Sequence, residues 1–303
     1  MEGTGRDVSG RFAGKSIVIT GGGAGLGREC ALQWSAEGGK IVVTDLVEDR
    51  AQAVAKEILA AGGDAIGLKT DVRIEAEVEQ AVGAAVENFG RLDIMFANAG
   101  RSLPGGPSIE DTTEEQWDDV TNTVYRGVFF SGKHACHQMK KQHGGNIVVT
   151  TSAAGINAYP VGFGAYAAGK AGAIGLVHSM ATEWGRYGIR VNGLAPTHGM
   201  SINFALPLDA PVLNMSYEEF ALQESGEAWH DDRFVGPLKV GRPPSLKDNA
   251  AVATFLASDD SAYMSGLIIP ACDRGNFAMT SIPFPKTWSL EDMAASAMDE
   301  PAS

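Results

Sequence analysis

The stretch TGGGAGLG, residues 20–27, stands between a short β-branched run and a helical pattern. The run KSIVIT (15–20) is typical of a buried parallel strand, and RECALQWSAEGG (28–39) predicts a helix that ends at two glycines. Glycines at such a junction let backbone amides approach a pyrophosphate, and the helix turns its positive N-terminal end toward that anion. On this motif alone, a flexible turn between strand and helix stays open as the alternative.

The same order of strand, turn and helix continues outward from this stretch. Further strands are predicted at residues 40–45, 65–72, 92–100, 145–155, 189–196 and 265–271, and one long helix is predicted over 113–142. Parallel strands need crossover connections, which helices supply. The sequence therefore predicts an α/β fold, a doubly wound Rossmann-type parallel sheet of about seven strands. We expect a single domain that spans residues 1–275.

Two regions depart from this alternation of strands and helices. Residues 197–240 carry aromatic and aliphatic side chains among prolines and acids, and so long a segment inside a compact domain is usually a functional lid. Residues 276–303 form an acidic C-terminal tail, for which a loosely docked terminus is the simplest interpretation.

The amino-acid composition argues against several classes of binding partner and favours one cellular location. The 303 residues carry a formal net charge of −13, which argues against nucleic acid and against an anionic membrane surface. Cys30, Cys136 and Cys272 lie far apart without CxxC spacing, which favours reduced thiols and a cytoplasmic location. The N-terminal stretch lacks the apolar core of a signal peptide, and no apolar run is long enough for a transmembrane helix.

Asp45 ends the second predicted strand. A carboxylate at this place can accept hydrogen bonds from both adenosine ribose hydroxyls, and it repels a 2′-phosphate. The next residues, Leu46 and Val47, are not basic. The cofactor is therefore predicted to be NAD and not NADP, although without the glycines a solvated acid at a strand end would be an ordinary finding.

Together these features resemble the short-chain dehydrogenase/reductase family in its single-domain subgroup, over residues 12–275. The motifs that carry the resemblance are TGGGAGLG for TGxxxGxG, DV (71–72), NAG (98–100), Ser152 with the YxxxK pair Tyr166 and Lys170, and GRPPSLKDNAAVATFLASDDSAYMSG (241–266). The resemblance implies NAD-binding residues Gly21, Gly25, Leu26, Gly27, Asp45, Asp71, Val72, Asn98, Gly100, Tyr166, Lys170, Thr197 and Gly199, and no metal. It also implies a homo-oligomer, a tetramer or dimer, assembled through the helices at 114–143 and 165–187.

Tyr166, Lys170 and Ser152 are the catalytic candidates. The nicotinamide takes a hydride from a secondary alcohol, so the protein must manage the hydroxyl proton. A free tyrosine has a pKa near 10, which must fall for a base that works near neutrality. Lys170 lies four residues later, about 40° round a helix, where its ammonium can stabilise the phenolate. Ser152 would hold the substrate oxygen, and the competing interpretation of the pair is a solvent-facing i,i+4 contact.

The family pattern is broken at the long helix. A catalytic Asn usually stands three residues before a glycine, and here that position is Val124, before Gly127. Asn122 lies two residues earlier, roughly 200° round a helix, and is expected to face away from the site. The spacing from Ser152 to Tyr166 is 14, one residue longer than expected, and the extra residue is placed in the intervening loop.

The residues after the sixth strand also differ from the family pattern Gly-x-Ile/Val-x-Thr, which clasps the nicotinamide carboxamide. Thr197 replaces the glycine, Gly199 the aliphatic residue and Ser201 the threonine. His198 is interpreted as a loop histidine and not as an acid or metal ligand, because no second metal-type ligand is close in sequence.

The substrate is predicted to be a hydrophobic or aromatic alcohol or ketone. The candidates for an apolar pocket lining are Leu103, Tyr159, Val161, Phe163, Met200, Phe204 and Trp229, although several of them would equally well pack a lid on the domain. Two other functions stay open: an epimerase or dehydratase that uses bound NAD transiently, and a non-catalytic nucleotide-binding regulator.

Overall fold

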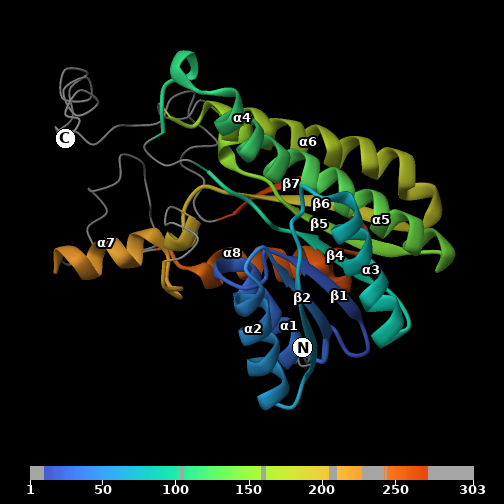
Figure 1. Cartoon of the computed structure of the whole chain (residues 1–303). Coiled ribbons are helices and arrows are strands. Elements are labelled where there is room, and N and C mark those ends of the chain that lie inside the picture. Colours follow the sequence, from blue (N-terminus) through green and yellow to red (C-terminus); the bar gives the residue numbers. More distant parts are fainter. Residues whose placement is uncertain are drawn as a thin grey trace, which may run out of the picture.

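The computed structural model describes residues 10–102, 106–157, 162–204, 210–226, 242 and 244–271. Figure 1 shows a twisted sheet with helices on both of its faces. The predictions for Leu103, Tyr159, Val161, Trp229, Cys272 and the tail 276–303 lie outside the described residues.

The described strands form one seven-stranded parallel sheet in the order β3-β2-β1-β4-β5-β6-β7. The strands are β1 (Ser16–Thr20), β2 (Lys40–Asp45), β3 (Asp64–Lys69), β4 (Ile94–Ala97), β5 (Gly145–Thr150), β6 (Ile189–Pro196) and β7 (Ile268–Ala271). The chain starts at β1, builds outward to β3, and then returns to place β4 on the other side of β1. Ligands of open α/β sheets bind at this kind of reversal, outside the carboxyl ends of the strands.

Eight α-helices are described along the chain. They are α1 (Gly25–Ala36), α2 (Glu48–Ala60), α3 (Glu75–Phe89), α4 (Glu114–Thr121), α5 (Gly127–Lys141), α6 (Gly164–Trp184), α7 (Tyr217–Ser225) and α8 (Leu246–Ala257). Helices α1, α2 and α8 pack on one face of the sheet, and α3, α5 and α6 pack on the other (Figure 1). The predicted doubly wound fold is confirmed.

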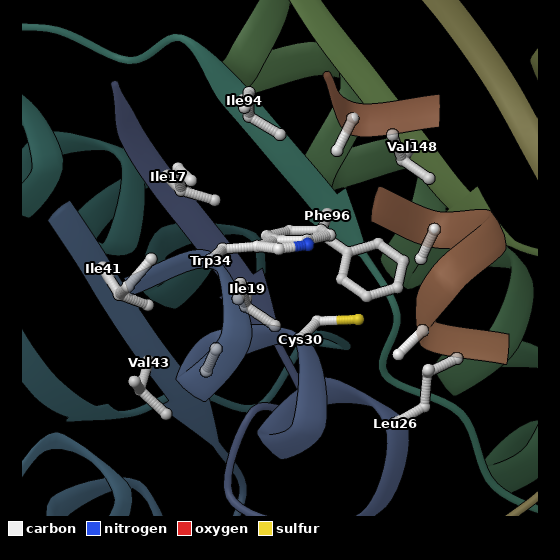
Figure 2. Packing of buried hydrophobic residues seen from close by; sticks show 14 of the residues in the cluster. Ile17, Ile19, Leu26, Cys30, Trp34, Ile41, Val43, Ile94, Phe96 and Val148 are labelled. Atoms are coloured by element: carbon white, nitrogen blue, oxygen red, sulfur yellow. The ribbon is translucent and has the colours of Figure 1, made fainter. Parts of the chain in front are cut away.

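The alternation of side chains along each strand builds two cores. Ile17 and Ile19 of β1 point to the face of α1, where Trp34 and Phe96 pack with ring centroids 5.3 Å apart (Figure 2). Val18, between them in sequence, points to the opposite face. Strands that are buried on both faces read as continuous apolar runs, which is why these segments were recognisable in the sequence.

The long predicted helix over 113–142 is present as one continuous helical run over residues 114–141, but it is not α-helical throughout. Thr113 caps α4 through a capping box with Gln116, but residues Asn122–Arg126 form a π-helical turn before α5 begins at Gly127. A π turn pairs each carbonyl with the amide five residues on, which changes the angular step between side chains. The sequence over this turn has neither Pro nor Gly to mark the break.

Three strands end earlier than predicted, and these ends bear on the site. β4 ends at Ala97, so Asn98 and Gly100 lie beyond it. β3 ends at Lys69, so Asp71 and Val72 lie in the turn that follows. β5 ends at Thr150, and Ser152 caps a short 3-10 helix, Ala153–Gly155, by accepting a hydrogen bond from the amide of Ala154. That local bond gives the backbone after Thr150 a partner outside the sheet, which ends the strand.

Candidate active site

A cleft of about 590 Å³ opens at the carboxyl ends of the strands, next to the reversal between β1 and β4. Ten of the predicted site residues line it: Gly21, Gly25, Leu26, Asp45, Asp71, Val72, Asn98, Gly100, Tyr166 and Lys170. Four predicted residues within the described chain are not among its lining: Gly27, Ser152, Thr197 and Gly199. The structure thus brings the glycine turn, the acid of β2 and the Tyr–Lys pair to one cavity.

The glycine turn is fixed by close approaches of backbone to backbone. Gly21 and Gly25 have φ angles of +63° and +53°, a region that favours glycine. A Cβ on Gly27 would lie 2.2 Å from the carbonyl oxygen of Gly21, so Gly27 serves the packing of the turn and not the cleft itself.

The N-terminus of α1 fits an anionic ligand. Ala24 is the N-cap residue of α1 and makes no side-chain cap bond, and the first turn of the helix holds no acid. The first amides of a helix need partners, and the helix dipole favours negative charge there. Gly25 and Leu26 at this end both line the cleft, as the predicted pyrophosphate site requires.

Asn98 positions the glycine turn. Its amide nitrogen donates to the carbonyl oxygens of Thr20 (3.1 Å) and Gly21 (3.3 Å), and its Oδ1 accepts from the hydroxyl of Thr150 (3.0 Å). These three bonds tie the ends of β1, β4 and β5 together. Thr20 and Thr150 were not predicted as site residues; their place at adjacent strand ends was the available signal.

Asp45 accepts hydrogen bonds from the amides of Gly23 (3.1 Å) and Val47 (3.0 Å). Burial raises the pKa of its carboxyl, and these amide bonds oppose that shift. Arg50, on the first turn of α2, lines the same cleft, and its guanidinium donates to the carbonyl oxygen of Ala210 at 3.0 Å. The sequence prediction weighed only the two residues directly after Asp45 and missed this arginine.

An ion network borders the cleft beside Asp71. The guanidinium of Arg73 binds both oxygens of Asp71 and lies 2.6 Å from Asp119 of α4, and Arg101 lies 2.8 Å from the other oxygen of Asp119. The hydrogen bond from Arg73 lowers the pKa of the Asp71 carboxyl. Sequence reasoning missed these partners, because only the fold brings α4 to the turn after β3.

Tyr166 and Lys170 share a buried face of α6. They are only 7% and 2% exposed, which contradicts the alternative of a solvent-facing pair. The Lys170 ammonium nitrogen donates to the carbonyl oxygen of Thr150 at 2.6 Å and lies 5.5 Å from the centroid of the Tyr166 ring. Burial lowers the pKa of Lys170 to about 7. A lysine held in this way can switch between its charged and neutral forms near neutrality.

Val124 stands beside this pair, inside the π turn. It is fully buried, and a Cβ on Gly169 would lie 2.3 Å from its Cγ2. A Cβ on Gly100 would meet Lys170 Nζ at 3.5 Å and Val124 Cγ1 at 3.8 Å. An apolar group therefore occupies the position where an amide was expected. Neither Asn122 nor Val124 is among the described residues that line the cleft.

The segment after β6 contributes Met200, Ser201 and Asn203 to the cleft. Of the apolar candidates that the structure describes, Met200 lines the cleft and Phe163 packs edge-on against Tyr166. The hydroxyl of Thr197 is buried without a hydrogen-bond partner among the described residues. His198 Nδ1 lies 3.2 Å from Glu218 of α7, and the described chain holds no cluster of three His, Cys, Asp or Glu side chains that could bind a metal.

Comparison with known proteins places the chain in a family. The sequence profile of short chain dehydrogenases matches residues 15–201, so the chain belongs to the short-chain dehydrogenase/reductase family. Levodione reductase from Leifsonia aquatica is 36% identical over 86% of this chain and 93% of its own length. (+)-Borneol dehydrogenase 2 from Salvia officinalis is 32% identical over 85% and 87%.

A solved structure points the same way. The 7α-hydroxysteroid dehydrogenase complexed with NADH and 7-oxo glycochenodeoxycholic acid is 29% identical, covers 91% of this chain and 98% of its own, and superposes with a TM-score of 0.73. The chain is thus an oxidoreductase of a family whose members act on CH–OH groups with a nicotinamide cofactor. In the part of the chain that is described, no helix is long and apolar enough to cross a membrane.

Proposed function

We propose that this protein is an NAD-dependent oxidoreductase that interconverts a secondary alcohol and a ketone. One observation carries the proposal: the buried Tyr166–Lys170 pair faces the same cleft as the glycine turn and Asp45. A cofactor bound along these residues and a substrate at Tyr166 would occupy one continuous cavity.

The cofactor, when bound, supplies the acceptor or donor of the hydride. Gly21, Gly25 and Leu26 would hold its pyrophosphate at the start of α1, and Asp71 and Val72 would adjoin its adenine. Thr197 and Gly199 would serve its nicotinamide end, Thr197 through a hydroxyl that is buried without a partner in the described chain. Gly27, Asn98 and Gly100 would act by shaping the turns around it.

Tyr166 is the proposed acid and base. In the oxidative direction its phenolic oxygen accepts the hydroxyl proton of the substrate, and in the reductive direction it returns that proton to the carbonyl oxygen. Lys170, whose ammonium nitrogen lies 5.5 Å from the centroid of the Tyr166 ring, would stabilise the phenolate when protonated. Ser152 would hold the substrate oxygen by donating its hydroxyl proton, which it can do while its oxygen accepts a hydrogen bond from the amide of Ala154.

Asp45 supports NAD as the cofactor. Its carboxylate is oriented by two backbone amides and lines the cleft, so a 2′-phosphate placed beside it would meet a fixed negative charge. Arg50 lines the same part of the cleft, and its positive charge would reduce the preference for NAD over NADP.

The proposed substrate is a hydrophobic or aromatic small molecule. Levodione reductase and (+)-borneol dehydrogenase 2, both similar to this chain, are named for compounds of that kind. Residues 197–240 would close over it as a lid, and α7 is the described helix of that segment. The catalytic domain would span residues 1–275.

We also propose assembly as a homotetramer or dimer through α4, α5 and α6. Trp117, Tyr125 and Phe129 support it, because these aromatic side chains on α4, α5 and the turn between them are 40–44% exposed. Cys30 and Cys136 are buried free thiols, which accords with the proposed cytoplasmic location.

The test is a screen of secondary alcohols with NAD and with NADP, in which turnover is measured as the change in absorbance of the reduced cofactor. Tyr166→Phe should lower turnover at least about a hundredfold and leave NAD binding within a few-fold by calorimetry. Unchanged turnover in this variant would remove Tyr166 from the mechanism. Product without net NADH would favour the epimerase or dehydratase, and NAD binding without turnover of any alcohol or ketone would favour the regulator.

A further inference from the structure

Two buried polar side chains outside the cleft form hydrogen bonds with the backbone segment that leads into it. The first is Glu218 on α7, which is 5% exposed. One of its oxygens accepts the amide of Gly199 at 3.2 Å, and the other lies 3.2 Å from His198 Nδ1. A buried carboxylate needs such partners, so its place in the fold depends on this segment.

The second is Asn249 on α8, which is fully buried. Its side-chain amide donates to the carbonyl oxygens of His198 (2.8 Å) and Gly199 (2.9 Å). Its Oδ1 has no hydrogen-bond partner among the described residues. An amide buried with an unsatisfied oxygen is costly, and the two donated bonds offset part of that cost only if the backbone at 198–199 keeps this shape.

The two helices that carry these side chains are joined at their N-terminal ends. The hydroxyl of Ser216, which caps α7, donates to the carbonyl oxygen of Pro244 at 2.7 Å, just before α8 begins. Glu218 and Asn249 thus approach residues 198–199 from a braced pair of elements. One takes the backbone N–H, and the other satisfies both carbonyl groups.

The backbone at His198 and Gly199 determines where the next two side chains lie. Gly199 has a φ of +68°, so the chain turns sharply there, and Met200 and Ser201 then line the cleft with Tyr166 and Lys170. Ser201 also packs on the start of α1, since a Cβ added to Gly25 would lie 2.6 Å from the Cβ of Ser201.

We propose that Glu218 and Asn249 are positioning residues that fix the segment 197–201 against the nicotinamide end of the cofactor. The inference rests on the proposed function, because the proposed acid and base Tyr166 must adjoin the reacting ring, and Met200 and Ser201 share its cavity. Neither residue lines the cleft: both bind His198 and Gly199, and the side-chain amide of Asn249 also lies 3.9 Å from the sulfur of Met200, which does line it.

The experiment compares NAD with ADP-ribose, which lacks the nicotinamide, by calorimetric titration. Asn249→Leu keeps the side-chain volume and removes both donors. We expect NAD affinity to fall about tenfold and ADP-ribose affinity to stay within about twofold. The matched control is Thr254→Val on the same helix, which removes a buried acceptor that faces Trp34 and is remote from the segment. It should leave both affinities unchanged at a comparable loss of stability.

Glu218 supplies a second, independent pair of variants, which decides the question should Asn249→Leu not fold. Glu218→Ala should lower NAD affinity selectively, and Glu218→Gln, which keeps an acceptor for the Gly199 amide, should restore most of it. Equal losses for NAD and ADP-ribose, or no loss, would overturn the positioning role. A wild-type protein that binds neither NAD nor NADP would instead overturn the proposed function.

Discussion

Lys170 is a cation buried at the centre of the proposed site, and its burial has a measurable consequence for stability. Its ammonium nitrogen has the carbonyl oxygen of Thr150 as a partner at 2.6 Å, and desolvation lowers its pKa to about 7. The variant Lys170→Met removes the titrating group and keeps the apolar stem. Because Tyr166 also titrates and lies against Lys170, the comparison is made in a Tyr166→Phe background, between the single and the double variant.

The magnitude follows from proton linkage. In the unfolded chain a lysine titrates near 10.4. Between the folded pKa of about 7 and this value the unfolded state binds more protons, so the free energy of unfolding rises with pH. The cost of burying Lys170 is therefore largest below the folded pKa and is relieved on the alkaline side. For one such group the relief between pH 7.5 and 9.5 is about 2.5 kcal/mol.

The assay is urea unfolding at several pH values across that interval. The difference in unfolding free energy between the single variant and the Lys170→Met double variant should move in favour of the lysine protein by about 2.5 kcal/mol as pH rises from about 7.5 to 9.5. The contribution of every other titrating group is shared by both proteins and cancels. A difference that stays flat across the interval would show that Lys170 keeps the pKa of a hydrated lysine, and the account of its burial would fail.

Three further outcomes are expected. Asp45→Ala should lower NAD affinity about tenfold and raise NADP affinity, because the charge opposed to a 2′-phosphate is lost while Arg50 stays; titration with both cofactors checks it. Gly27→Ala should lower the free energy of unfolding by roughly 1–3 kcal/mol in urea, since its Cβ would meet the Gly21 carbonyl at 2.2 Å. Asp119→Ala should weaken AMP binding by a factor of about two to five, measured by calorimetry, because Arg73 and Arg101 lose their shared partner next to Asp71, which is proposed to adjoin the adenine.

The sheet was predictable because its strands are buried on both faces. Runs such as SIVIT and KIVVTD are continuous and β-branched, and glycines or caps mark most of the helices between them. The π turn at Asn122–Arg126 was not predicted, since the stretch holds neither Pro nor Gly to mark a change in helical hydrogen bonding. The early ends of β3 and β5 have a local cause: Asp71 and Ser152 accept hydrogen bonds from backbone amides two residues on, and these bonds compete with the ladder.

The site was predictable where its residues are close in sequence. Tyr166 and Lys170 share one face through helical spacing, and the glycine turn is continuous. Glu218 and Asn249 reach Gly199 across 19 and 50 residues, and nothing in their local sequence marks them as polar groups that serve a loop. Their roles depend on how α7 and α8 pack, and only the fold supplies that information.

Val124 and Lys170 are best understood together. In the family pattern an amide stands at the position of Val124, and an amide beside the ammonium would provide dipoles that stabilise its charge. Here Lys170 Nζ and a methyl group of Val124 lie 3.5 Å and 3.8 Å from the point that a Cβ on Gly100 would occupy. Burial among apolar neighbours favours the neutral amine, which is the direction of the Lys170 shift. A valine side chain offers this lysine no dipole, so the charge on Lys170 depends on its bond to Thr150 and on whatever occupies the cleft.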